Sequence, residues 1–117
     1  MHSMHILVAD DDLDVLFVLS EVLRLAGYHV SEAGSRERAE AILREGGVDL
    51  LIADSVLRGD EGSSLARDAG LPVLMMSGDP DRILQFENSS FPFLAKPFHS
   101  AELLSFVSQV LGKPAEG

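Results

Sequence analysis

Two short apolar runs in the sequence end in carboxylates. Residues 6–9 are followed by Asp10 and Asp11, and residues 50–53 are followed by Asp54. Apolar runs this short, followed by turn-forming residues, are typical of buried strands. Because a buried strand cannot hide a bare charge, these carboxylates are expected where the strands emerge from the core.

Ser77 and Lys96 follow two later apolar runs in the same way. Ligands of open parallel sheets bind beyond the carboxyl ends of the strands, so these polar residues are predicted to share one pocket. Three carboxylates in one pocket repel one another without a cation, and Mg²⁺ suits a site with few carboxylates. A hydroxyl and an ammonium beside such an ion match the needs of phosphoryl transfer. Asp54 stands alone and is the best candidate for the nucleophile, which would form an acyl phosphate, whereas Asp10 and Asp11 would hold the metal.

Strands and helices are predicted to alternate five times along the chain. Continuous apolar strands between amphipathic helices indicate an α/β fold, with a parallel sheet covered on both faces. The predicted N-caps of the first, fourth and last helices are Asp12, Asp79 and Ser100, and Ser35 is predicted to be the first residue of the second helix. The predicted strands cover residues 5–10, 28–32, 49–54, 72–76 and 91–95, and the predicted helices cover residues 13–26, 35–45, 63–69, 79–87 and 100–111.

The first predicted helix carries two sets of apolar residues. Leu16, Phe17 and Leu25 fall off its main stripe, and they are either core residues at a slightly different phase or an exposed apolar patch. The main stripe has the helical spacing of a core face and consists of Val15, Val18, Leu19, Val22 and Ala26.

The composition narrows the class of protein. The 117 residues, 46% of them hydrophobic, suit one domain at residues 5–112, with an extension or tag remnant at 1–4 and a tail at 113–117. Without cysteine, neither disulfides nor thiolate metal sites can form. A net charge of −10 disfavours direct binding to nucleic acid, so partners are expected to be proteins and ligands cations. The chain lacks a signal-peptide pattern and an apolar run of about 20 residues, so we expect a cytoplasmic protein without membrane insertion.

Four motifs together carry a family resemblance. They are the acidic pair in Val8-Ala9-Asp10-Asp11, the acceptor Asp54 with Gly62 eight residues later, the hydroxyl in Met76-Ser77-Gly78, and Lys96-Pro97-Phe98. Each motif is weak alone, but all four occur in this order and at predicted strand ends. Over nearly its whole length the chain resembles a response-regulator receiver domain of two-component signal transduction, such as the receiver of a hybrid histidine kinase. The resemblance implies a flavodoxin-like (βα)5 fold, a doubly wound parallel sheet with strand order 2-1-3-4-5.

The resemblance also implies a role for each matching residue. Asp54 would accept a phosphoryl group from a histidine kinase or a histidine phosphotransfer protein, and the domain would not be an enzyme acting on an outside substrate. Ser77 and Lys96 would contact that group, and the bond between Lys96 and Pro97 would be cis. Ser77 and Phe93 would form the switch toward an unknown output protein or a domain of a parent chain. The implied Mg²⁺ ligands are Asp10, Asp11, Asp54 and the backbone carbonyl of Val56, and the implied docking residues for the phosphodonor are Leu16 and Phe17.

The sequence departs from the family pattern at four places. Arg58 stands where proline is usual, Phe93 replaces tyrosine, residues 88–93 lack the usual Gly-Ala-acid-acid run, and only nine residues separate Gly62 from Pro72. These departures concern the family's usual output surface rather than the pocket. Arg58 and Phe93 alone support an alternative interpretation as a pseudo-receiver, which binds a partner without phosphorylation, whereas the complete pocket argues against it. A second alternative, a small Mg²⁺-dependent phosphatase, would need a substrate cap or a second catalytic acid, for which this chain has little room.

Overall fold

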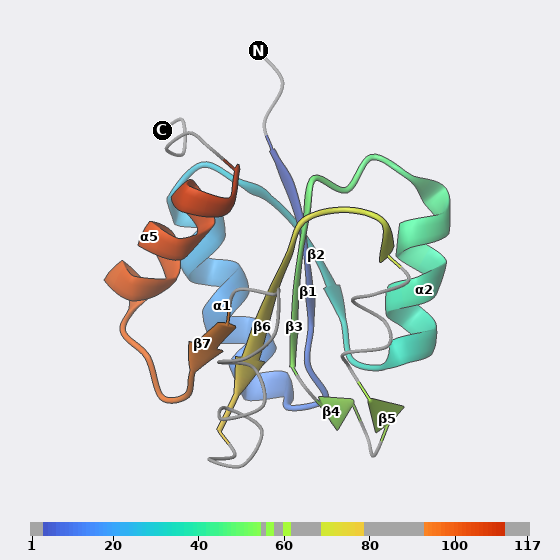
Figure 1. The fold of residues 1–117 in the computed structure, drawn as a ribbon, viewed down its shortest axis with the longest axis horizontal. Coiled ribbons are helices and arrows are strands. Elements are labelled where there is room, and N and C mark those ends of the chain that lie inside the picture. The colour runs from blue at the N-terminus through green and yellow to red at the C-terminus, as the bar shows by residue number, and fades with distance from the viewer. Residues whose placement is uncertain (1–3, 55, 58–59, 62–68, 79–92, 112–117) are drawn as a thin grey trace.

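The centre of the molecule is a parallel β-sheet. The computed structural model describes residues 4–54, 56–57, 60–61, 69–78 and 93–111. Its long strands are β1 (His5–Ala9), β2 (His29–Ala33), β3 (Leu50–Asp54), β6 (Val73–Ser77) and β7 (Phe93–Ala95). They form one five-stranded sheet in the order β2-β1-β3-β6-β7 (Figure 1). Counted along the chain, this order is 2-1-3-4-5, so the predicted flavodoxin-like sheet is confirmed.

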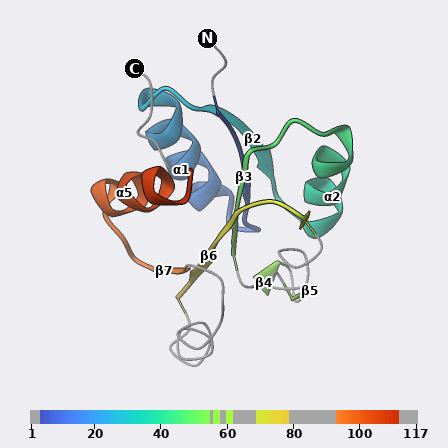
Figure 2. The same cartoon turned by 45° about the horizontal axis from the view of Figure 1, so that its top comes forward.

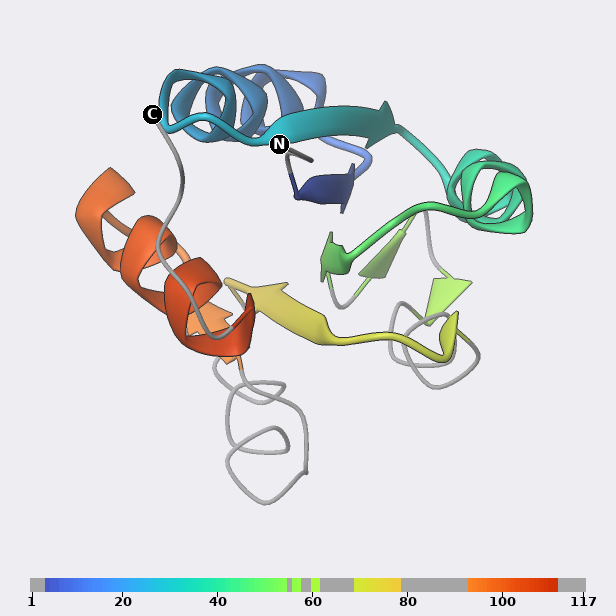
Figure 3. The ribbon, with the colours of Figure 1, turned by 90° about the horizontal axis from the view of Figure 1, so that it is seen from above.

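Helices cover both faces of this sheet. α1 (Leu13–Leu25) and α5 (Ser100–Leu111) lie on one face, and α2 (Arg36–Glu45) lies on the other (Figures 1 and 3). Because successive side chains of a strand point to opposite faces, each strand contributes to two cores. The core under α1 and α5 contains Ile6, Val8, Ile52 and Met76, and the core under α2 contains Leu7, Ala9, Ala53 and Met75.

The described helix starts test two of the three predicted caps, since Asp79 lies outside the described residues. The side chain of Asp12 accepts backbone N–H groups of α1, which confirms this cap. Ser35, predicted as the first residue of the second helix, is instead the cap of α2, and its side chain accepts the backbone N–H of Arg38.

The prediction for the last helix is wrong, because Ser100 is already the first residue of α5. The preceding residue, His99, accepts two backbone N–H groups of that first turn and donates its own backbone N–H to the Glu102 carboxylate at 3.0 Å. The glutamate three residues after the cap therefore closes this helix end.

The buried face of α1 differs from the predicted stripe. Leu16 is 3% exposed and belongs to the core, so its predicted role in docking a phosphodonor is wrong. Phe17 and Leu25 are 65% and 85% exposed, and Val18, a predicted core residue, is 59% exposed. The buried residues of α1 are Leu16, Leu19, Ser20 and Leu23. The sequence pattern placed the buried face of α1 wrongly because the buried Ser20 is polar. The partly buried valines beside that face have the spacing expected of a core stripe.

A short antiparallel pair follows β3. It consists of β4 (Val56–Leu57) and β5 (Asp60–Glu61), and it lies beyond the carboxyl end of β3 (Figure 2). The sequence pattern did not predict it. The predicted helix at residues 79–87, most of that at 63–69, the start of the last predicted strand and Arg58 lie outside the described residues.

Candidate functional site

Four strands bring polar residues to one edge of the sheet. Asp10 follows β1, Asp54 ends β3, Ser77 ends β6, and Lys96 follows β7. The four strands run parallel, so their carboxyl ends meet at one edge, where ligands of such sheets bind. This edge is the one that β4 and β5 adjoin (Figure 2).

Lys96 connects the two carboxylates of this edge. Its Nζ donates to Oδ2 of Asp10 at 2.7 Å and to Oδ2 of Asp54 at 2.5 Å. The side chain of Asp10 is 1% exposed, that of Asp54 is 17% exposed, and that of Lys96 is 22% exposed. Lys96 starts at the edge strand β7 and reaches past β6, so one cation joins the ends of three strands. The resemblance implied its pairing with phosphorylated Asp54, but the contact with Asp10 follows from the strand order and not from spacing in the sequence.

Burial and ion pairing act in opposing directions on the pKa values of Asp10 and Lys96. Burial raises the pKa of the Asp10 carboxyl, since desolvation disfavours the charged form. The ammonium of Lys96 and the backbone N–H of Asp12, 2.9 Å from Asp10 Oδ1, lower that pKa without cancelling the effect of burial. For Lys96, burial acts to lower the pKa of the ammonium, but the contacts with Asp10 and Asp54 outweigh it, and its pKa is raised. Lys96 therefore stays charged at neutral pH.

The predicted switch residues lie on neighbouring strands. Ser77, at the end of β6, is 1% exposed, and its backbone carbonyl accepts the N–H of Lys96 at 2.8 Å. Phe93, at the start of β7, is half-buried and packs against the core on the α2 face. The Lys96–Pro97 bond is cis, as the resemblance implied. The backbone bond from Lys96 to Ser77 ties the lysine to the end of β6.

The predicted Mg²⁺ ligands are arranged around the lysine. Asp10 and Asp54 each direct an oxygen toward Nζ of Lys96, and Asp11 is exposed. Within the described part of the chain, no three carboxylate or imidazole side chains are grouped as a metal site. The donor chemistry still fits Mg²⁺, because carboxylate oxygens and a backbone carbonyl are the hard ligands that this ion prefers. The implied carbonyl ligand, Val56, is the first residue of β4.

Comparison with known proteins shows which family this chain is similar to. A family model for the response regulator receiver domain matches residues 6–108. The chain is 33% identical to the DNA-binding transcriptional regulator NtrC of Bradyrhizobium sp., in an alignment that covers 95% of this chain and 25% of that protein. It spans between about a quarter and about half of the length of the curated relatives that it matches.

Solved structures agree over nearly the whole chain. A putative response regulator from Chloroflexus aurantiacus J-10-fl is 36% identical with a TM-score of 0.83, and the match covers 96% of this chain and 100% of that one. The receiver domain of the hybrid histidine kinase CckA is 34% identical with a TM-score of 0.77, and the match covers 92% of this chain and 98% of that one.

Among the described residues, no helix is both long and apolar enough to cross a membrane.

Proposed function

Because this chain belongs to the response-regulator receiver domain family, which consists of signalling domains, we propose that it is a phosphoacceptor switch. Asp54 takes a phosphoryl group from a histidine kinase or a histidine phosphotransfer protein, and the domain then controls a protein partner or other domains of its own chain. The observation that carries this proposal is the ammonium of Lys96, which is held 2.5 Å from Asp54 and 2.7 Å from the buried Asp10.

In the proposed reaction, an Oδ atom of Asp54 attacks phosphorus in line with the bond to the donor imidazole. The new O–P bond forms as the P–N bond breaks, and the nitrogen leaves with the electron pair and takes a proton from solvent. Lys96 stays beside the acceptor and neutralises charge on the phosphoryl oxygens, because its raised pKa keeps it charged. Mg²⁺, which Asp10, Asp11, Asp54 and the Val56 carbonyl would hold, supplies further charge neutralisation when bound.

The proposed switch uses the two strands next to the acceptor. The phosphoryl group on Asp54 attracts the hydroxyl of Ser77, which ends the neighbouring strand β6. The Ser77 carbonyl accepts the backbone N–H of Lys96, the residue that follows β7. A shift of the residues around Ser77 should therefore move β7, the strand that begins with Phe93. Phe93 then changes its packing, and this alters the surface that a partner contacts.

Intact mass spectrometry tests the acceptor directly. The chain is incubated with acetyl phosphate, with and without Mg²⁺, and a Mg²⁺-dependent gain of about 80 Da is expected for one acyl phosphate. Asp54→Asn should show no gain. Asp49→Asn is the matched control, because Asp49 lies just before the opposite end of the same strand and should leave the gain unchanged. Absence of the gain in the folded parent chain would favour the pseudo-receiver instead.

We also propose that the exposed Phe17 contacts the phosphodonor. Phe17 is 65% exposed on α1, the helix that follows Asp10 and Asp11. Phe17→Glu should slow phosphotransfer from the donor protein at unchanged stability, and labelling by acetyl phosphate should continue. Leu25→Glu, at the far end of the same helix and 85% exposed, is the control. Undiminished phosphotransfer to a folded Phe17→Glu chain would show that the donor docks elsewhere.

A further inference from the structure

The amino ends of β1 and β2 bring together a second group of reactive side chains. Figure 1 shows these strand ends at the opposite end of the sheet from β4 and β5, so the group is separate from the edge that carries Asp54. His5 begins β1, and its Nε2 lies 2.7 Å from the hydroxyl oxygen of Ser31 on β2. Its Nδ1 lies 3.3 Å from the backbone carbonyl oxygen of Gly47. A hydroxyl beside an imidazole that a third group orients is the arrangement of an activated nucleophile.

The contact with Gly47 determines where the hydroxyl proton of Ser31 points. A carbonyl oxygen can only accept a hydrogen bond, so Nδ1 of His5 must carry the proton in this contact. In a neutral imidazole the other nitrogen, Nε2, then has a lone pair and can only accept. Ser31 therefore donates its hydroxyl proton to Nε2 at 2.7 Å, within the range of about 2.6–3.2 Å over which a general base takes a proton.

Titratable and charged groups from three other elements surround His5. His29, the first residue of β2, places its ring in an edge arrangement beside that of His5, with 4.6 Å between the ring centroids. Asp49, just before β3, accepts the backbone N–H of His5 at 2.8 Å. α2, which covers this face of the sheet, ends in Arg44 and Glu45, and both are exposed. The ring and backbone contacts of His5 hold its imidazole in one place at the start of β1.

We propose that Ser31 is a nucleophile that takes an acyl group from small activated esters, with His5 as its general base. Ser31 is half-buried on β2, an outer strand of the five-stranded sheet, so a small ester can reach its hydroxyl. Its Oγ forms a bond to the ester carbonyl carbon while its proton moves to Nε2 of His5. The tetrahedral intermediate then expels the alcohol, which leaves with the electron pair of the broken C–O bond and takes the proton from His5. The products are an acyl ester on Ser31 and a free alcohol.

Acetylation by p-nitrophenyl acetate tests this proposal. The chain is incubated with the ester at neutral pH, and peptide mass mapping follows the gain of about 42 Da that one acetyl group adds at a single nucleophile. General-base catalysis contributes about 10²–10⁴-fold, and an open site is expected at the lower end of that range. Ser31 should therefore be acetylated about 100-fold faster than Ser105, an exposed serine of α5 in the same chain. Asp54 takes no part in this step, so its failure is distinguishable from failure of the proposed phosphotransfer.

Histidine variants separate base catalysis from mere accessibility of the hydroxyl. His5→Gln keeps a hydrogen-bonding side chain that is not a base, and it should slow acetylation of Ser31 by about 100-fold. His99→Gln, at an exposed position before α5, is the matched control and should leave the rate unchanged. Thermal melting checks that both variants are folded.

The parent chain provides a second measurement, which decides the matter if His5→Gln does not fold. Acetylation of Ser31 should slow as the pH falls, in step with proton uptake by the His5 ring followed by NMR, because a protonated imidazole cannot act as a base. The proposal is overturned if Ser31 reacts no faster than Ser105, if folded His5→Gln reacts like the parent, or if the rate at Ser31 does not follow the protonation of His5.

Discussion

Replacing Lys96 by methionine separates the electrostatic role of its ammonium from the packing of its side chain. Methionine keeps a long, flexible apolar side chain. The change removes the donor that contacts Oδ2 of Asp10 at 2.7 Å and Oδ2 of Asp54 at 2.5 Å. Asp10 then remains with a side chain that is 1% exposed, and it keeps the hydrogen bond from the backbone N–H of Asp12. A buried carboxylate without a counter-ion should destabilise the fold.

The size of this loss follows from the burial of the three groups. Removing one partner of a buried ion pair costs about 3–5 kcal/mol. Lys96 and Asp54 are 22% and 17% exposed, so water screens part of their interaction. Asp10 can also escape part of the cost by taking a proton, since burial already raises its pKa. We therefore expect the free energy of unfolding at pH 7 to fall by about 2–4 kcal/mol, which is about 30- to 700-fold in the folding equilibrium.

The loss should grow with pH. Without Lys96, the pKa of folded Asp10 rises further above its unfolded value of 3.8, because two effects that lower it are removed. A raised folded pKa favours the fold when the group is protonated, and that stability is lost as pH rises through the folded pKa. The parent suffers less of this loss because Lys96 holds the pKa of Asp10 down. The difference between parent and variant should therefore be small near the unfolded value of 3.8 and largest above the folded pKa of the variant.

Urea unfolding followed by circular dichroism measures this difference at a series of pH values from the unfolded pKa of Asp10, 3.8, up to neutral pH, because the folded pKa of Asp10 is raised above its unfolded value. Arg38→Met is the control, because it removes an exposed cation from α2 and should change stability by no more than about 0.5 kcal/mol. A loss for Lys96→Met of less than about 0.5 kcal/mol at pH 7, no larger than an ordinary surface change, would refute the reasoning. A loss that shrinks as pH rises would refute it equally.

Three further predictions concern stability. Leu23→Ala, at a fully buried position of α1, should lower the free energy of unfolding in urea by about 2–5 kcal/mol. Leu25→Ala, at an 85% exposed position of the same helix, should change it by no more than about 0.5 kcal/mol. Equal losses would contradict the assignment of Leu23 to the buried face of α1. Ser35→Ala removes the side chain that caps α2 and should lower the free energy of unfolding by about 1 kcal/mol. Ser35→Asp keeps an oxygen acceptor at this position and should lower it by less. Equal losses in the two variants would argue against the capping hydrogen bond. The pKa of Lys96 is raised by its contacts with Asp10 and Asp54, so its stabilisation at neutral pH should persist up to the ordinary value of 10.5 and be lost as pH rises through the folded pKa. Unfolding measured from neutral to strongly alkaline pH should therefore show a decline in the parent that Lys96→Met lacks.

Local patterns in the sequence were sufficient to predict the order of strands and helices along the chain and the polar residues at the carboxyl ends of the strands. The apolar runs that end in Asp10 and Asp54 are short and continuous, which is how a strand buried on both faces must be composed. The cap at Asp12 could be predicted because a capping side chain acts only on the next few residues. The grouping of polar residues followed from one further rule, that parallel strands end at the same edge of a sheet.

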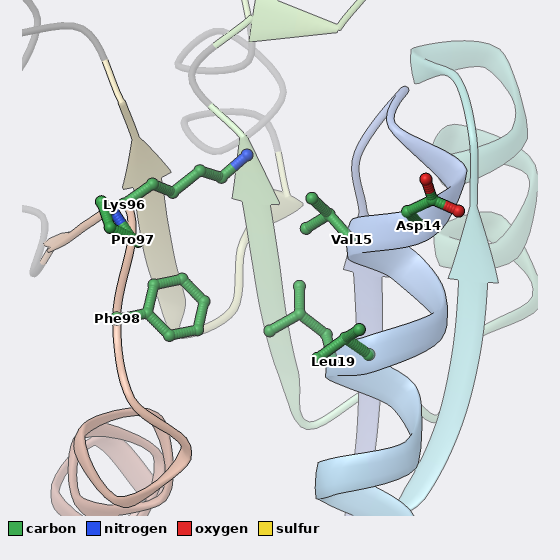
Figure 4. Close-up of a pocket in the computed structure, with 7 residues that line it drawn as sticks. Asp14, Val15, Leu19, Lys96, Pro97 and Phe98 are labelled. Carbon is green, nitrogen blue, oxygen red and sulfur yellow. The ribbon is translucent and has the colours of Figure 1, made fainter.

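Only the tertiary structure decided which side chains meet. Whether Leu16 or Val18 is buried depends on how α1 rotates over the sheet, and both rotations place apolar residues inside. The contact of Lys96 with Asp10 depends on the order of the strands, which brings residues 86 positions apart to 2.7 Å. An apolar groove lined by Val15 and Phe98 depends on how the segment before α5 passes α1 (Figure 4). These features arise from packing between elements that are distant in the chain. The sequence alone was sufficient for features that depend on the periodic spacing of buried residues within one element or on residues that are neighbours in the chain.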